Sequence, residues 1–185
     1  DHIVASSQLY GGTVTQLDVS LRRFGIETTF VPGTDPADYK AALTENTKAI
    51  YTEIVANPSG EVADLEGLAE VAHEAGVPLI VDNTIPTPFL LNPFKFGADI
   101  VVHSATKYLG GHGTSVGGAI VDSGNFDFGK DPEKFPLFNT PDEGYHGLVY
   151  ARDLGKNGAF GVNLSYILKA RVGLLRDLGQ SISPF

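Results

Sequence analysis

The sequence contains no cysteine, no methionine and no tryptophan among its 185 residues. The absence of cysteine excludes disulfides, thiolate catalysis and cysteine metal ligands, and with them the disulfide-rich class of secreted proteins. Basic residues are also few, because 13 lysines and arginines stand against 22 aspartates and glutamates and give a formal net charge of −9. A chain this acidic, with its charges interspersed, is a poor match for nucleic acid or for an anionic membrane surface.

Long hydrophobic runs are absent as well. No stretch approaches the roughly 20 apolar residues that a membrane-spanning helix needs. No signal or transit segment is visible at Asp1, so we expect a cytoplasmic protein by default. The chain begins without methionine and stops at Ser183-Pro184-Phe185, which favours an internal piece of a longer polypeptide.

Apolar, β-branched runs alternate with helical patterns along the chain. We expect strands at residues 2–5, 26–31, 49–55, 78–81, 99–102 and 117–121, and helices at 14–24, 35–43, 65–75 and 160–178. Helices between strands predict an α/β domain with a mostly parallel sheet covered by helices on both faces. We expect a long surface excursion over residues 124–147, and a single domain over 1–185 with no internal boundary.

The most informative segment is Ser104-Ala105-Thr106-Lys107-Tyr108-Leu109-Gly110-Gly111-His112-Gly113. It places one lysine, Lys107, between hydroxyl side chains and a glycine-rich turn, directly after an apolar strand. A lysine that forms an imine beside phosphate-binding hydroxyls requires this setting, so the segment indicates a pyridoxal 5′-phosphate (PLP) site. Taken alone, Lys107 fits a solvated surface lysine better.

Three further side chains stand where neighbouring strands end, and in an open α/β sheet this edge binds ligands. Asp82 follows a buried strand, so its carboxylate needs a partner; a pyridinium N–H is suitable, and a helix-capping role is the alternative. Tyr10 precedes two glycines and offers a ring that can stack on a cofactor and a hydroxyl that can assist catalytic proton transfer; the alternative is a tyrosine that packs at a turn. Asn57 can contact a ring oxygen, or it forms a plain Asn-Pro turn. The histidines show no paired metal spacing, so we expect no metal.

These segments together resemble the Cys/Met-metabolism PLP-dependent enzymes of fold type I. The resemblance rests on Leu9-Tyr10-Gly11-Gly12-Thr13, Val81-Asp82-Asn83-Thr84 and Ser104–Tyr108, and it extends over nearly the whole chain. Within that group, Gly110-Gly111-His112-Gly113-Thr114 and Tyr145-His146-Gly147-Leu148 resemble the O-acetylhomoserine sulfhydrylase branch.

The resemblance implies a role for each matching residue. Lys107 would form the Schiff base with PLP and then carry protons, and Tyr10 would stack on the cofactor ring. Asp82 would pair with the pyridine nitrogen. The remaining implied cofactor contacts are Ser104 and Thr106 to the phosphate, Asn57 to the ring oxygen, and Thr84 close to the ring.

The implied reaction is γ-replacement on O-acetylhomoserine, in which acetate leaves and sulfide or a thiol adds to give homocysteine or methionine. The resemblance also implies a homodimer or homotetramer. The segments that complete the phosphate site and bind the substrate carboxylate would then lie outside this sequence, which would be most of the large PLP-binding domain.

Two other interpretations remain open at the level of sequence. A sister activity of the same family is the nearer one: cystathionine γ-synthase, a γ-lyase, or O-succinylhomoserine sulfhydrylase. A non-catalytic α/β binding module that keeps the fold is the more distant one.

Overall fold

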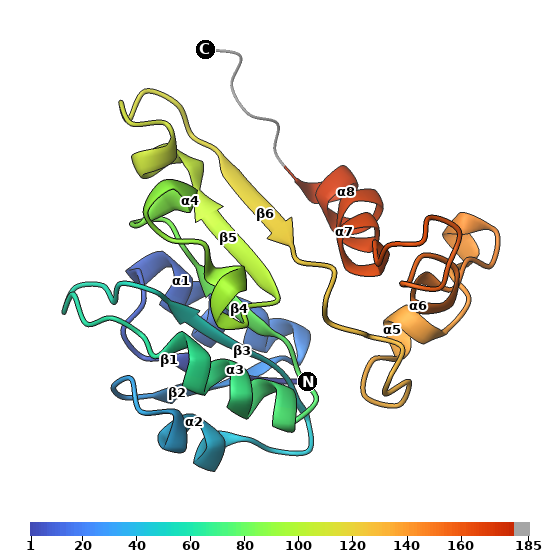
Figure 1. The fold of residues 1–185 in the computed structure, drawn as a ribbon, viewed down its shortest axis with the longest axis horizontal. Helices are drawn as coiled ribbons and strands as arrows, with labels where there is room; N and C mark the ends of the chain where they lie inside the picture. The colour runs from blue at the N-terminus through green and yellow to red at the C-terminus, as the bar shows by residue number, and fades with distance from the viewer. Residues whose placement is uncertain (180–185) are drawn as a thin grey trace. The chain divides into compact units, whose positions relative to one another are not determined.

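The structure, a computed structural model, describes residues 1–179 and contains one six-stranded sheet (Figure 1). Its strands are β1 (His2–Ser6), β2 (Glu27–Val31), β3 (Thr47–Glu53), β4 (Leu79–Asp82), β5 (Ile100–Ser104) and β6 (Gly118–Asp122), in the spatial order β2-β1-β3-β4-β5-β6. The first five strands pair in parallel, and β6 runs against β5 at the edge (Figure 1). The predicted strands and the mostly parallel sheet are therefore confirmed.

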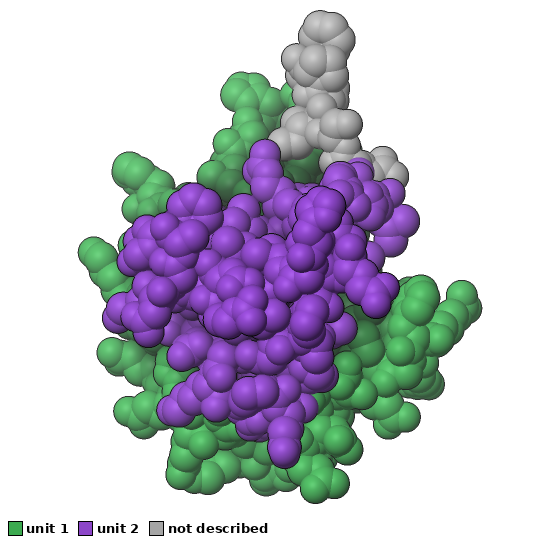
Figure 2. Space-filling view, turned by 90° about the vertical axis from the view of Figure 1, so that its right-hand side faces the viewer, with its two compact units in different colours: residues 1–120, 183–185 green, residues 121–182 purple. Residues whose placement is uncertain are grey.

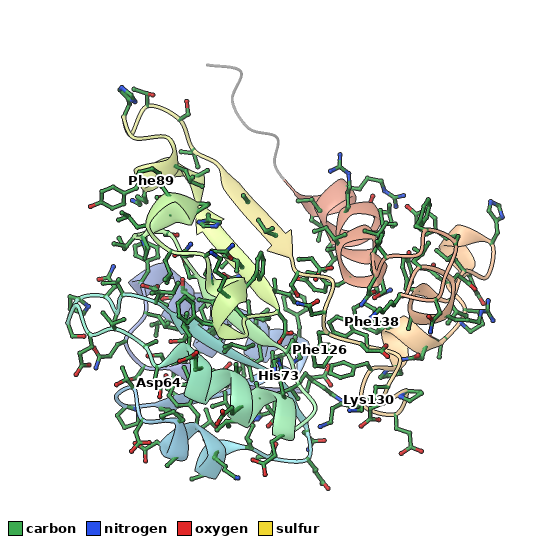
Figure 3. The ribbon with its side chains drawn as sticks, in the orientation of Figure 1. Asp64, His73, Phe89, Phe126, Lys130 and Phe138 are labelled. Atoms are coloured by element: carbon green, nitrogen blue, oxygen red, sulfur yellow. The ribbon has the colours of Figure 1, made fainter. Side chains whose placement is uncertain are left out.

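The helices of the first part of the chain match the predicted bounds to within one residue, except that the first begins three residues earlier, at Gly11. One continuous helical stretch comprises α1 (Gly11–Thr15), the π segment η1 (Gln16–Ser20) and the 3₁₀ segment η2 (Leu21–Phe24); α2 (Pro36–Ala42) and α3 (Leu65–Glu74) follow. Gly25 ends the first stretch at a positive φ of 75°, and Asp64 caps α3 by accepting the N–H of Gly67 at 3.1 Å (Figure 3).

Both faces of the sheet are covered. Neighbouring residues of a strand point to opposite faces, and Val4 and Ala5 of β1 are both fully buried. Val4 is in register with Ile50, and both are fully buried. Ala5 is in register with Tyr51 on the other face, where it packs with Leu9 and Leu17 of the first helical stretch. We call this second face the α1 face; it carries the side chains discussed below.

The structure adds short helices that the sequence did not predict. They are α4 (Thr87–Leu90), η3 (Pro93–Phe96), η4 (Ala105–Leu109), α5 (Pro136–Asn139), η5 (Glu143–Tyr145) and α6 (Tyr150–Asp153). Three of them, α4, η3 and α5, begin at or directly after a proline, and each of the six lasts about one turn, which is too short for a helical period to be visible in the sequence.

The described residues form two compact units, Asp1–Ile120 and a second that begins at Val121 (Figure 2). The boundary lies inside β6. The expectation of a single domain over residues 1–185 stays a prediction, since compactness alone does not define a domain.

Two expectations for the second unit were wrong. The stretch 124–147 is no simple surface excursion, because Phe128 and Phe135 are buried in an aromatic cluster. The closing helix begins at Ser165 rather than Phe160; it comprises α7 (Ser165–Ala170), η6 (Arg171–Leu175) and α8 (Arg176–Leu178). Leu164 keeps a non-helical backbone, with φ −116° and ψ 8°, because its N–H bonds the carbonyl of Leu154 at 2.8 Å.

Candidate functional site

Four strand ends carry the site, and hydrogen bonds join their loops. The N–H of Tyr10, after β1, donates to Oε1 of Glu53 at the end of β3 at 2.6 Å. Glu53 is in register with Asp82 at the end of β4, so both carboxylates lie on the α1 face. Sequence reasoning had placed Glu53 in a strand and given it no role, although a carboxylate at the end of a buried strand is the same signal that singled out Asp82.

The segment after β4 is fixed on both sides of Asp82. Oδ1 of Asp82 accepts the N–H of Thr84 at 2.8 Å, and Oγ1 of Thr84 accepts the N–H of Ser104 at 2.8 Å. Between them, Asn83 is fully buried; it donates its backbone N–H to Val102 O and its side-chain amide to Leu91 O, each at 3.0 Å. The Asn83 Oδ1 has no partner among the described residues. Asp82 and Thr84 are thus held on a rigid turn.

The electrostatics of the α1 face are set by two neighbouring, partly buried carboxyl groups, those of Glu53 and Asp82. Burial raises the pKa of Glu53 above its usual range; the N–H of Tyr10 opposes this, and the charge of Asp82 adds to it. Burial also raises the pKa of the Tyr51 phenol, with further contributions from Asp82 and Glu53. This face therefore has an excess of negative charge and suits a cationic group such as a protonated ring nitrogen.

Lys107 lies in a looped segment directly after β5. Its side chain is exposed, and its backbone leaves helical geometry at φ −89° and ψ −118°. The N–H of Gly111 bonds its carbonyl at 2.8 Å, and a Cβ on Gly110 would lie 2.8 Å from the carbonyl oxygen of Ala105. Glycine is therefore needed at position 110 for this loop to close behind the lysine.

The predicted site residues differ in the hydrogen bonds that they already make within the chain. The Thr106 hydroxyl donates to Gly117 O at 3.3 Å and accepts the Gly117 N–H at 3.0 Å. To donate to a phosphate, this hydroxyl must give up its bond to the Gly117 carbonyl. Asn57 is exposed on a loop that is tied to the turn after β1, because its N–H donates to Gln8 O at 3.4 Å. The structure links Tyr10, Asp82, Thr84 and Ser104 through Glu53 and the β3–β4 register, whereas Thr106 and Asn57 are held by other contacts.

Neither a cluster of metal ligands nor a membrane-spanning helix is found in residues 1–179. In this part of the chain no group of three or more histidine, aspartate or glutamate side chains is placed to hold a metal ion. The helices described there are all too short or too polar to cross a bilayer.

The site therefore combines an amine, two carboxylates, hydroxyls and an exposed aromatic ring at one edge of a parallel sheet. This donor set fits PLP, which needs an amine for its aldehyde, a carboxylate for its ring nitrogen and donors for its phosphate. An exposed ring over the same edge matches a flat heterocycle.

Comparisons with known proteins agree with this geometry. The chain is 52% identical over 184 residues to an O-acetyl-L-homoserine sulfhydrylase of Leptospira meyeri, and 50% identical over 186 residues to a homocysteine/cysteine synthase of Saccharomyces cerevisiae. The matches cover 99% and 100% of this chain but 41% and 40% of those proteins, so the chain spans about two fifths of their length.

A solved structure shows the same fold. A Campylobacter jejuni protein assigned as an O-acetylhomoserine (thiol)-lyase, which holds a pyridoxyl-lysine monophosphate, superposes with a TM-score of 0.87 at 36% identity. The match covers 100% of this chain and 44% of that one. Residues 1–185 also match the profile of the Cys/Met metabolism PLP-dependent enzymes over their whole length. The chain belongs to that family, the Cys/Met metabolism PLP-dependent enzymes of fold type I.

Proposed function

We propose that the protein carrying this chain is a PLP-dependent transferase that replaces the γ-acetoxy group of O-acetylhomoserine with sulfide or a thiol, giving homocysteine or methionine and acetate. The observation that carries this proposal is Lys107 at the end of β5, one strand from Asp82, in a chain about half identical to sulfhydrylases. We assign residues 1–185 to its cofactor-binding domain and expect a cytoplasmic homodimer or homotetramer.

The residues divide the work by their chemistry. When bound, PLP supplies an electron sink for carbanions next to the amino-acid nitrogen. The amine of Lys107 binds the cofactor's aldehyde and then takes and returns the substrate's protons. The carboxylate of Asp82 accepts the hydrogen bond of the ring nitrogen and stabilises its positive charge.

The remaining side chains hold the ring in place. The Tyr10 ring stacks on one face of the cofactor ring, and Thr84 lies beside the edge of that ring whose nitrogen pairs with Asp82. The hydroxyls of Ser104 and Thr106 donate to the phosphate, and the Asn57 amide donates to the ring oxygen.

The first test concerns the cofactor and Lys107. The purified full-length protein is expected to be yellow, and borohydride should bleach it and fix the cofactor to a peptide containing Lys107. Lys107→Ala should abolish both fixation and turnover, whereas Lys95→Ala removes an exposed lysine from η3 and should keep both. A colourless protein that ignores added PLP would favour the non-catalytic binding module.

The second test concerns the substrate. The full-length protein is assayed with O-acetyl- and O-succinylhomoserine, each with sulfide and with cysteine. Homocysteine from the acetyl ester and sulfide is the expected main product. Product from the succinyl ester alone, or cystathionine as the main product, would replace this proposal with a sister activity of the family.

A further inference from the structure

The backbone of Tyr10 is more tightly held than its exposed position requires. Its side chain is 58% exposed, yet its N–H donates to Glu53 Oε1 at 2.6 Å. Its carbonyl accepts the N–H groups of Thr13 at 2.8 Å and Val14 at 3.0 Å. Both backbone polar groups of Tyr10 are therefore fixed while its ring remains open to a ligand.

The acceptor of that N–H is an unusual side chain for its position. Glu53 is the last residue of β3 and only 8% exposed, where an apolar or hydroxyl side chain would cost far less to bury. Burial raises its pKa, and the neighbouring Asp82 raises it further. A carboxyl group kept at such a place despite this cost points to a specific requirement for its oxygen atoms.

The position of Glu53 relates Tyr10 to Asp82. Register partners on parallel strands present their side chains on the same face, so Glu53 stands next to Asp82 on the α1 face. Its other contact is the main chain of Tyr10. One rigid side chain on β3 thus connects the residue assigned to the face of the cofactor ring with the residue assigned to its edge.

We propose that Glu53 is a positioning residue for the cofactor. By accepting the Tyr10 N–H, it sets the distance of the Tyr10 ring from the plane of the cofactor ring, whose nitrogen is assigned to Asp82. This inference rests on the proposed function, since it takes Tyr10 and Asp82 as PLP contacts. The requirement is for an acceptor with the reach of a glutamyl side chain rather than for a negative charge.

Three variants of the full-length protein separate reach from charge. Glu53→Gln keeps an acceptor oxygen of the same reach without the charge, Glu53→Asp keeps the charge but is one methylene shorter, and Glu53→Ala loses both. The matched control is Asp99→Ala. Asp99 is also a buried carboxyl that accepts a main-chain N–H, that of Leu79 at 2.9 Å. It stands just before β5, at the amino ends of the strands, whereas Glu53 stands at their carboxyl ends.

The dissociation constant of PLP is measured by titrating each apoprotein and following the absorbance and circular dichroism of the cofactor; kcat, KM and the unfolding midpoint are measured in parallel. Glu53→Ala and Glu53→Asp should weaken PLP binding about tenfold, the scale of one aromatic stacking contact, and should weaken the cofactor's circular dichroism. Glu53→Gln should restore both to within about twofold of wild type. Asp99→Ala should lower the unfolding midpoint and leave PLP binding unchanged.

The outcomes distinguish the two proposals. If wild type binds PLP and turns over substrate while Glu53→Ala and Glu53→Asp match it, the role of Glu53 is overturned and the proposed function stands. If Glu53→Asp matches wild type and Glu53→Gln does not, the charge is what matters and positioning is overturned. If wild type itself binds no PLP, the proposed function fails first.

Discussion

The hydroxyl of Thr84 accepts the backbone N–H of Ser104 at 2.8 Å, which ties the turn after β4 to the end of β5. The same residue donates its own N–H to Oδ1 of Asp82 at 2.8 Å. Thr84 therefore sets the distance between the carboxylate on one strand and the segment with Lys107 on the next. A hydroxyl is needed because it accepts one bond without the burial cost of a charge.

Replacing Thr84 should loosen this junction. Thr84→Val keeps the shape but leaves the Ser104 N–H without its acceptor, so we expect a loss of about 1–3 kcal/mol in the free energy of unfolding and weaker PLP binding. Thr84→Ser restores the hydroxyl and should recover most of both. Thr140→Val removes an exposed threonine hydroxyl in the second unit and should change neither. Equal effects of the two valine variants, measured by denaturant titration, would contradict this account.

The ring of Tyr10 depends on the absence of a side chain at position 12. A Cβ on Gly12 would lie 2.6 Å from Cε1 of the Tyr10 ring, whereas a Cβ on Gly11 meets no atom within 4 Å. Gly12→Ala should therefore displace the ring and weaken PLP binding by up to about tenfold.

The neighbouring glycine supplies the control. Both Gly11 and Gly12 lie in α1, so alanine at either position gains about 1 kcal/mol of helix propensity. Gly11→Ala is expected to raise the unfolding midpoint without changing the PLP titration, and Gly12→Ala is expected to change the titration despite the same gain. If both variants bind PLP like wild type, the ring of Tyr10 does not depend on the space above Gly12.

The sequence predicted the parallel sheet well because buried parallel strands are continuous apolar runs bounded by polar turns, as Leu79–Asp82 illustrates. It also predicted that Asp82 and Lys107 would share an edge, since both follow neighbouring strands; the place of Thr84 was implied only by the family resemblance. The hydrogen bonds that join separate strand ends could not be predicted, because a bond such as that of Tyr10 to Glu53 joins residues 43 positions apart. The aromatic cluster of the second unit was missed for a related reason: its members follow no period.

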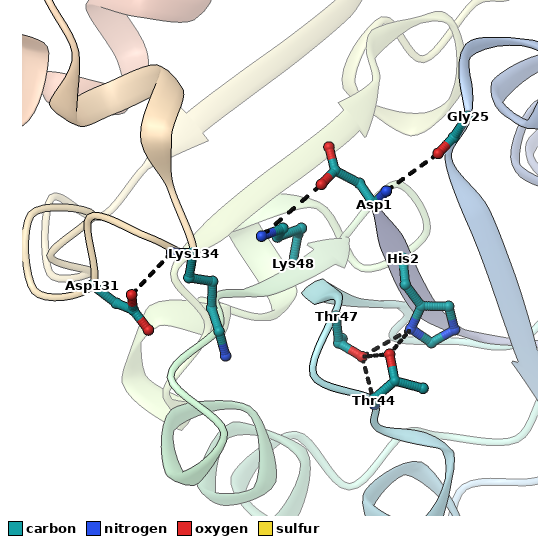
Figure 4. A network of polar contacts seen from close by, with 8 residues as sticks. All are labelled: Asp1, His2, Gly25, Thr44, Thr47, Lys48, Asp131 and Lys134. Atoms are coloured by element: carbon teal, nitrogen blue, oxygen red, sulfur yellow. Dashed lines mark hydrogen bonds and ion pairs between the residues drawn. The ribbon is translucent and has the colours of Figure 1, made fainter.

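His2 should make stability depend on pH. It is buried at the start of β1, and one ring nitrogen contacts Oγ1 of Thr47 at 2.8 Å (Figure 4). The other ring nitrogen contacts Oγ1 of Thr29 at 2.9 Å. Burial lowers its pKa below the usual 6.5, although the carboxylate of Glu27 offsets part of the shift. The folded state therefore prefers the neutral ring, so its contribution is complete above pH 6.5 and is lost as pH falls toward the lower pKa of the folded protein.

A variant isolates this contribution. His2→Asn cannot titrate, so its stability deficit relative to wild type should be about 1–2 kcal/mol near pH 8 and should shrink as pH falls below about 6.5. Urea titrations of both proteins across this range measure the deficit. A deficit that stays constant or grows at low pH would contradict a lowered pKa for His2.

Phe128 is the centre of the aromatic cluster in the second unit. Its ring stacks on Phe138 at 4.2 Å between centroids and on Tyr166 at 5.8 Å, and it meets Phe126 edge-on at 4.7 Å (Figure 3 labels Phe126 and Phe138). Phe128→Ala removes every one of these contacts and leaves a cavity, so we expect a loss of about 3–5 kcal/mol in the free energy of unfolding. Phe128→Leu refills part of the space and should lose less.

Leu137→Ala, at a residue that is 68% exposed, should change stability by no more than about 0.5 kcal/mol. Because 124–147 was expected to be a surface excursion, equal effects of Phe128→Ala and Leu137→Ala would restore that first interpretation.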